Sequence, residues 1–93
     1  MIKTFANKET AALFMDYAVR RIPSDIRDVA RRKLLQLNRS LIIEDLRVPP
    51  GNRLERLKGE RAGQYSVRIN NQWRLCFRFV KGDAFDVEIV DYH

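Results

Sequence analysis

Regular alternation of apolar and polar side chains in the last third of the chain constrains the fold most. Between residues 65 and 90 three alternating segments are separated by two turn sequences, Asn70-Asn71-Gln72 and Lys81-Gly82-Asp83. Successive side chains on a strand point to opposite faces of a sheet. The pattern therefore predicts an antiparallel meander with one apolar and one polar face. The side chains expected to face the core are Tyr65, Val67, Ile69, Trp73, Leu75, Phe77, Phe79, Phe85, Val87 and Ile89.

Two helices are expected before the meander. Asn7 offers an N-cap for a helix over about residues 8–17, with Tyr17 in its apolar set. Ser24 is expected to cap a second helix, whose apolar positions recur at the i, i+3, i+4 spacing of a helix face. That face comprises Ile26, Val29, Ala30, Lys33, Leu34, Leu37 and Leu41. Both helices should cover the apolar face of the sheet, so the predicted fold class is α+β.

The remaining segments are shorter. Residues 2–6 predict a first strand, residues 54–57 begin the meander, and residues 59–63 form a turn or loop. Residues 45–53 contain two adjacent prolines and a glycine, from which we expect a loop without regular structure. At 93 residues the chain is predicted to form a single domain, residues 1–93.

The chain is strongly basic, with a formal charge of +6 and 13 arginines among its 18 basic residues. Such a balance favours a polyanionic partner, most often nucleic acid, and the alternative is a solvated basic surface without a specific role. The last eleven residues carry four acids and neither lysine nor arginine. We expect those acids to find arginine neighbours in the sheet.

Cysteine usage and hydropathy limit the class of protein further. Cys76 is the only cysteine, which excludes an internal disulfide and a cysteine-based zinc site and leaves a packed thiol as the expectation. No apolar run approaches the roughly 20 residues that a membrane span needs. The first residues lack the apolar stretch of a signal peptide, so we expect a cytoplasmic protein that does not bind a membrane.

The polar face of the predicted sheet presents cations. It is expected to carry Arg68, Arg74, Arg78, Asp86, Glu88 and Tyr92. A further group just before the meander can border this face, namely Arg53, Arg56, Lys58 and Arg61. The result would be a concave cationic strip with Tyr92 and His93, the only histidine, at one rim.

Such a strip suits cleavage of RNA by its own 2′-hydroxyl. That reaction needs a base, cations around the phosphorane-like transition state and an acid for the leaving 5′-oxygen, but neither a metal nor a cofactor. Imidazole is the side chain that exchanges protons most readily near neutral pH.

Each of these candidate groups also has a purely structural interpretation. Arg74 and Arg78 can pair with Asp86 and Glu88, Lys58 can be a solvated rim residue, Tyr92 a packed aromatic and His93 a frayed terminus.

Three stretches resemble the HigB toxins of the RelE/ParE superfamily of bacterial toxin–antitoxin systems. They are residues 57–63, which contain Leu57-Lys58-Gly59, residues 65–74, which contain Asn71-Gln72-Trp73-Arg74, and the closing Val90-Asp91-Tyr92-His93. The resemblance extends to residues 2–5 and 46–54. It implies a RelE-type fold, with two N-terminal helices packed on a mostly antiparallel, twisted sheet. It also implies a ribosome-dependent endoribonuclease that cuts mRNA in the A site of the 70S ribosome.

The resemblance also implies partners and site residues. A HigA-like helix-turn-helix antitoxin would neutralise the toxin, and operator DNA would be bound only through the antitoxin complex. The catalytic residues would be Lys58, Arg74, Tyr92 and His93. Arg68 is expected as a further phosphate contact, with Arg53, Arg56, Arg61 and Arg78 binding RNA nearby. Some family members carry a histidine where this chain has Glu55, a carboxylate that can act as a base but also repels phosphate.

Two other functions remain open. One is a catalytically silent module that binds RNA or an antitoxin on the same fold. The other is a ParE-like toxin directed at DNA gyrase, a mechanism that needs no C-terminal Tyr-His pair. Cleavage of translated mRNA would distinguish the expected nuclease from both.

Overall fold

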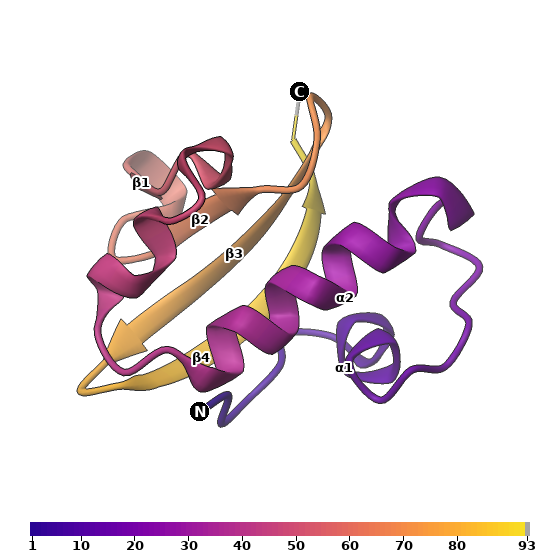
Figure 1. Cartoon of the computed structure of the whole chain (residues 1–93), viewed down its shortest axis with the longest axis horizontal. Helices are drawn as coiled ribbons and strands as arrows, with labels where there is room; N and C mark the ends of the chain where they lie inside the picture. The colour runs from indigo at the N-terminus through magenta and orange to yellow at the C-terminus, as the bar shows by residue number, and fades with distance from the viewer. Residues whose placement is uncertain (93) are drawn as a thin grey trace.

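The chain, as a computed structural model, is described over residues 1–92, so that His93 lies outside the described residues. Helices α1 (Lys8–Phe14) and α2 (Ser24–Arg39) pack on one side of a sheet with strand order β1-β2-β3-β4 (Figure 1). All neighbouring strands are antiparallel, and their bounds are β1 Glu55–Arg56, β2 Tyr65–Arg68, β3 Trp73–Val80 and β4 Asp83–Asp91. The predicted α+β class, with two N-terminal helices on an antiparallel sheet, is confirmed.

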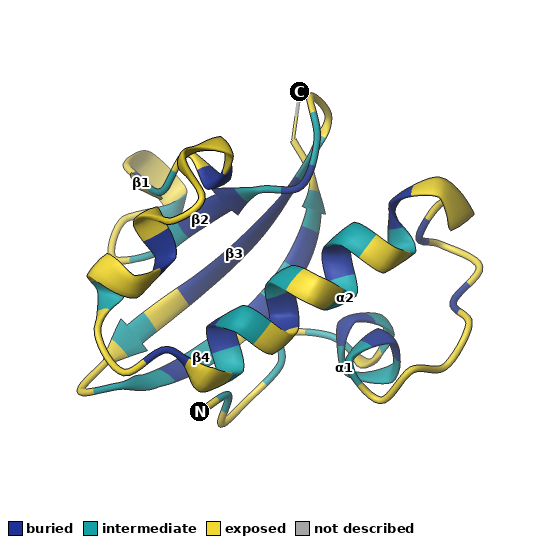
Figure 2. Ribbon diagram, in the orientation of Figure 1, coloured by how far each residue is buried: buried dark blue, intermediate teal, exposed yellow. Residues whose placement is uncertain are grey.

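Helix α2 supplies one wall of the core. Its buried residues are Ile26, Ala30, Leu34 and Leu37, and Figure 2 shows this inner side against the sheet, with exposed positions facing outward. They pack in one cluster with buried side chains of β3 and β4, which include Leu75, Phe77 and Val87. The prediction for Leu41 is wrong. The helix ends at Arg39 and the chain turns away, so the side chain of Leu41 is 78% exposed.

The helix termini differ from the expectation in two places. Asn7 caps α1 as predicted, because its Oδ1 accepts a hydrogen bond of 2.8 Å from the backbone N–H of Thr10. However, α1 ends at Phe14 and Asp16 takes a left-handed conformation, which leaves Tyr17 exposed and outside the helix. Ser24 is the first residue of α2 and not its cap, because Pro23 occupies the N-cap position.

A β-bulge changes the face of one predicted core residue. Cys76 pairs with Glu88, but Arg78 pairs with Phe85, so Asp86 and Val87 together oppose Phe77. Asp86 adopts a left-handed conformation, with φ of 54°, as the extra residue of a bulge often does. The inserted residue reverses the alternation on its N-terminal side. Ala84 is therefore fully buried, whereas Phe85 lies across from Arg78 and contradicts the predicted inward position.

The connections differ from the prediction in both directions: residues 2–6 are less regular than expected, and residues 45–53 are more regular. Residues 2–6 form only two isolated parallel bridges to β4, from Ile2 to Ala84 and from Phe5 to Val87. Residues 45–53, expected to lack regular structure, include the end of one short 3-10 helix, η1 (Ile43–Arg47), and all of another, η2 (Pro50–Asn52). Proline is compatible with the first turn of a helix, where its missing N–H needs no partner. A third, η3 (Gly59–Arg61), lies between β1 and β2.

Within residues 1–92 no helix combines the length and the apolar character that crossing a membrane requires.

Candidate functional site

Arg74 of β3 is the best-anchored cation on the face of the sheet that points away from α2. Its Nε donates to Ser66 Oγ at 2.8 Å, and one terminal nitrogen donates to the Arg53 carbonyl at 2.7 Å. The other terminal nitrogen lies 3.9 Å from a Glu55 carboxylate oxygen. Arg74 is only 9% exposed, so the expectation of an open arginine strip is wrong here. The segment that leads into β1 covers it.

Arg68 of β2 stands directly opposite Arg74 in the sheet register. Like charges in such a cross-strand pair repel each other. The two guanidinium groups bind different partners. Arg74 donates to Ser66, whereas Arg68 donates to the Asn71 side chain in the β2–β3 turn. Glu55 contacts this pair through Arg74. The Arg68–Arg74 pair therefore favours a bound anion.

Tyr92 follows β4 and meets Arg74. The Arg74 Cζ lies 5.8 Å from the centroid of the Tyr92 ring, which is within the range of a cation–π contact. Tyr92 is 43% exposed, so a ligand can reach its ring from solvent. The structure thus brings together two of the four predicted catalytic residues. His93, the third, lies outside the described residues.

The end of β4 is held by the β2–β3 turn. The backbone N–H of Tyr92 donates to the Gln72 carbonyl at 2.6 Å, and Gln72 Nε2 donates to the Asp91 carboxylate at 3.1 and 3.2 Å. Asn70 shapes this turn, because its Oδ1 accepts from the backbone N–H groups of Gln72 and Trp73. These contacts position Tyr92 beside Arg74.

Lys58, the fourth predicted catalytic residue, lies between β1 and η3. It is exposed, and among residues 1–92 it forms neither a hydrogen bond nor an ion pair by its side chain. Its neighbour Leu57 is buried, and the Leu57 N–H donates to the Gln64 carbonyl at 2.8 Å, which anchors the segment. Lys58 is therefore a solvated ammonium on an anchored backbone. Among the contacts of residues 1–92, none joins Lys58 to Arg74.

The other predicted RNA contacts divide into two groups. Arg53 is exposed and adjoins Arg74 through its carbonyl, whereas Arg56 lies over the Tyr65 ring on the other side of β1. Arg61 and Arg78 are paired with acids, since Arg61 contacts Glu88 at 3.3 Å and Arg78 contacts Asp86 at 3.3 Å. Asp86 and Glu88 thus have arginine neighbours as expected, whereas Asp83 lies 3.8 Å from the N-terminal amine of Met1 and Asp91 accepts from Gln72.

Ser66 and Glu55 were not predicted as partners of Arg74, although the resemblance had drawn attention to Glu55. Their contacts with Arg74 depend on β1 pairing with β2, which places Glu55 opposite Ser66. Strand alternation does place Ser66 on the same face as Arg68, which is the one signal that pointed to it. No group of three or more potential metal ligands occurs among the 92 described positions.

Cys76 lies between Arg74 and Arg78 on β3 and is fully buried. Burial raises the pKa of its thiol, and Glu88 adds to the effect, while Arg61 and Arg74 oppose it. A raised pKa leaves less of the reactive thiolate at a given pH. We expect Ellman's reagent at pH 8 to label the native protein roughly tenfold or more slowly than the urea-unfolded chain. Equal rates would contradict the packed-thiol interpretation.

Comparisons with known proteins cover nearly the whole chain. Residues 3–93 match the family described as RelE-like toxin of type II toxin-antitoxin system HigB. The chain is 46% identical over 67 residues to Toxin HigB-1 of Vibrio cholerae, covering 72% of this chain and 70% of the relative. It is 32% identical over 97 residues to Endoribonuclease HigB of Proteus vulgaris, covering 100% of both. A YoeB-YefM complex from Staphylococcus aureus shares the fold, with a TM-score of 0.61, 16% identity and coverage of 100% and 98%.

Proposed function

The chain belongs to the HigB family of RelE-like toxins from type II toxin–antitoxin systems, and from this premise we propose that it is a ribosome-dependent endoribonuclease. Its substrate would be translated mRNA in the A site of the 70S ribosome. The similarity along the full length of a relative named Endoribonuclease HigB supports the nuclease activity. The observation that carries the proposal is the fixed guanidinium of Arg74 beside the accessible ring of Tyr92.

The proposed reaction is attack of a ribose 2′-hydroxyl on the adjacent phosphate. A bond forms between O2′ and phosphorus while the bond from phosphorus to O5′ breaks, which leaves a 2′,3′-cyclic phosphate and a 5′-hydroxyl end. Negative charge accumulates on the phosphate oxygens in the transition state. Preorganised cations that are already held in place stabilise this charge without reorganising during the reaction.

Arg74 is proposed to supply most of that stabilisation, with Arg68 as the second cation. Ser66 and the Arg53 carbonyl fix the Arg74 guanidinium, which leaves the nitrogen near Glu55 as the one that faces an incoming phosphate. Phosphate would then replace Glu55 as the partner of Arg74. Arginine suits this role because it stays charged and has five N–H donors, so the nitrogen that the protein does not hold can still donate to a phosphate oxygen.

Proton transfer is proposed for Tyr92 and His93, and Lys58 is proposed as a further phosphate contact. The cation–π contact supports Tyr92, because it places the ring beside the cation that would bind phosphate. Lys58 can approach a phosphate by side-chain rotation, since it is exposed and unpaired within residues 1–92. Arg53 is proposed to extend the RNA path, whereas Arg61 and Arg78 would have to release their acids first.

As a toxin of such a system, the protein has an antitoxin as its partner. We propose an antitoxin of the HigA type with a helix-turn-helix fold, and contact with operator DNA only through the toxin–antitoxin complex. The cytoplasm, where translation takes place, is the proposed location.

Primer extension on a translated message tests the function. Induced expression is expected to produce cuts within codons that disappear when the start codon is removed, and the 3′ ends are expected to carry cyclic phosphate. Tyr92→Phe is expected to reduce cleavage about 10²-fold or more if the hydroxyl transfers a proton. The phenylalanine ring would keep the contact with Arg74, so the variant is expected to be as stable as the unmodified chain, and thermal unfolding checks this. Growth arrest with intact mRNA and broken DNA would instead support a gyrase-directed toxin.

A further inference from the structure

A groove separate from Arg74 runs along the outer side of α2. It has a volume of about 690 Å³ and lies between α2 and the segment that contains η1 and η2. Its lining residues are Arg32, Lys33, Gln36, Arg39, Ser40, Asp45, Val48 and Pro49. Arg74 lies on the other side of the sheet from α2, so the groove is distinct from the Arg74–Tyr92 contact. Arg68, the second cation of that site, is the one that acts electrostatically on Lys33 in the groove.

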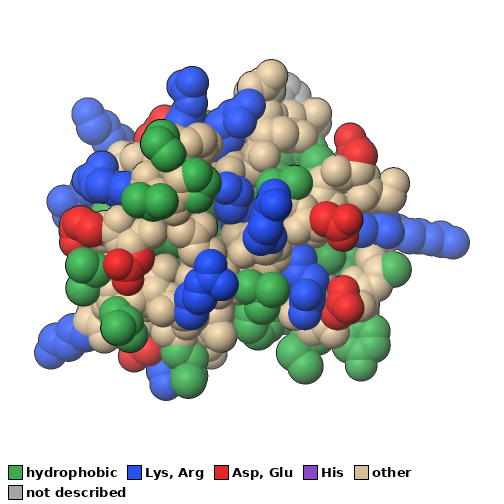
Figure 3. Space-filling model, viewed as in Figure 1, with side chains coloured by type: hydrophobic (Ala, Val, Ile, Leu, Met, Phe, Trp, Pro, Cys, Tyr) green, Lys and Arg blue, Asp and Glu red, His purple; other side chains and the backbone are tan. Residues whose placement is uncertain are grey.

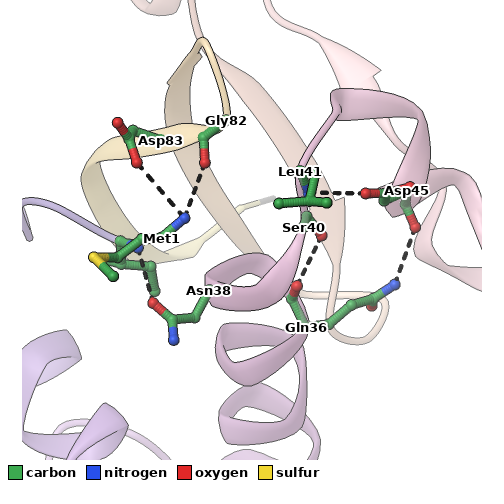
Figure 4. A network of polar contacts seen from close by, with 9 residues as sticks. Met1, Gln36, Asn38, Ser40, Leu41, Asp45, Gly82 and Asp83 are labelled. Carbon is green, nitrogen blue, oxygen red and sulfur yellow. Dashed lines mark hydrogen bonds and ion pairs between the residues drawn. The ribbon is translucent and has the colours of Figure 1, made fainter.

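Hydrogen bonds fix the shape of this groove. Gln36 Nε2 donates to the backbone carbonyl of Asp45 at 3.3 Å (Figure 4). It also donates to the Val48 carbonyl at 2.6 Å, and together these bonds tie the helix to the opposite wall. Gln36 Oε1 accepts from Nδ2 of Asn52, which is fully buried. Both walls are therefore held together without a ligand, as in a preformed binding surface.

The groove carries excess positive charge. Three of its lining residues are cations and one, Asp45, is an acid, whose carboxylate already accepts the backbone N–H groups of Leu41 and Ile42. Within residues 1–92 neither Arg32 nor Arg39 makes an ion pair. Burial lowers the pKa of Lys33, and the charges of Arg32 and Arg68 lower it further. Anionic groups are therefore favoured in the groove.

Exposed aliphatic side chains flank these cations. Leu41 is 78% exposed, Ile42 55% and Val48 68%, and all three lie in or beside the opposite wall. Figure 3 shows this face of the molecule, with hydrophobic side chains among the lysines and arginines. None of the eight lining residues is aromatic. Single-stranded RNA is bound through aromatic stacking as well as cations, whereas protein interfaces combine apolar contacts with arginine.

We propose that this groove is the docking surface for an acidic segment of the antitoxin that also carries apolar side chains. The carboxylates of the segment would pair with Arg32 and Arg39, and with Lys33, whose ammonium also donates to Asn52 Oδ1. Its apolar side chains would cover Val48 and the residues beside it. The inference rests on the proposed function only in requiring an antitoxin partner. It places the antitoxin segment in the groove and not at the contact between Arg74 and Tyr92.

The test compares two double variants with equal changes in charge. Arg39→Glu with Val48→Ser alters the groove at the end far from Arg68, because Arg39 lies six residues beyond Lys33, about 9 Å along the helix. Arg20→Glu with Met15→Ser is the control, since it reverses one exposed arginine and removes one exposed apolar side chain elsewhere. Thermal unfolding verifies that both variants are folded. The probe is the purified cognate antitoxin, titrated by calorimetry without ribosomes.

The groove variant is expected to bind the antitoxin about 10–100-fold more weakly, while the control stays within about twofold of the unmodified chain. Equal affinities of the two variants would overturn the proposal. It would also be overturned if the groove variant kept its antitoxin affinity but lost translation-dependent cleavage, because the groove would then bind RNA. The calorimetry does not depend on cleavage, so a failure of the proposed nuclease activity would be recognised separately.

A second measurement uses Lys33 directly. A carbodiimide joins a lysine amine to a carboxylate only when the two are in contact. In the toxin–antitoxin complex we expect an amide between Lys33 and an antitoxin aspartate or glutamate, identified by mass spectrometry. Lys8, on α1, is the reference amine and is not expected to couple. Coupling of Lys8 without coupling of Lys33 would place the acidic segment elsewhere.

Discussion

Replacing Arg74 by alanine is expected to lower translation-dependent mRNA cleavage by about 10²–10³-fold, which is typical for the loss of one preorganised group that stabilises transition-state charge. The measurement is the single-turnover rate of cleavage on programmed ribosomes. Arg74→Lys is expected to recover only part of the rate. A lysine keeps the charge but cannot bind Ser66 and the Arg53 carbonyl while also facing a phosphate.

Folding has to be separated from catalysis in this experiment. The change leaves the buried Ser66 hydroxyl without its partner, at a cost of about 1–3 kcal/mol in the free energy of unfolding. The free energy of unfolding of each variant is therefore measured by urea titration, and cleavage is assayed at a temperature at which all variants are folded. Arg20→Ala is the control, since Arg20 is exposed and lies outside the proposed site. If folded Arg74→Ala cleaved within about threefold of the unmodified chain, Arg74 would have no catalytic role.

The second large effect concerns stability. Phe77 is the largest fully buried side chain, and it lies at the bulge between β3 and β4. Phe77→Ala is expected to lower the free energy of unfolding by about 3–5 kcal/mol, through lost burial and the cavity left behind. Proteins of this size are stable by only about 5–15 kcal/mol, so the variant would be close to unfolded at 37 °C. Urea denaturation at 10 °C measures the difference.

Phe85→Ala is the matched control. The alternation of residues 83–91 predicts Phe85 to be as buried as Phe77, whereas the bulge turns it to the other face, across from Arg78. We expect its replacement to cost less than about half as much as that of Phe77, because a half-buried ring loses less apolar contact. Equal costs for the two variants would mean that the register contains no bulge in solution.

Much of the fold follows from local pattern. The face of α2, the Asn7 cap and the apolar sides of β2 and β3 were all predictable, because side-chain periodicity depends only on the geometry of each element. The cations expected on the polar face were also identified by this rule. The resemblance of the chain to the HigB toxins then indicated which of these cations to consider for catalysis.

The partners of those cations were decided by tertiary structure. Arg74 pairs with Glu55 and not with an acid of β4, because β1 folds back along β2 and places Glu55 beside Ser66. The bulge at Asp86 reversed the faces of Ala84 and Phe85, since one inserted residue shifts a period of two by half a cycle. Periodicity thus determined which side of an element is apolar. Contacts between elements far apart in the chain determined which charges meet, because local sequence carries no information about the neighbour across the sheet.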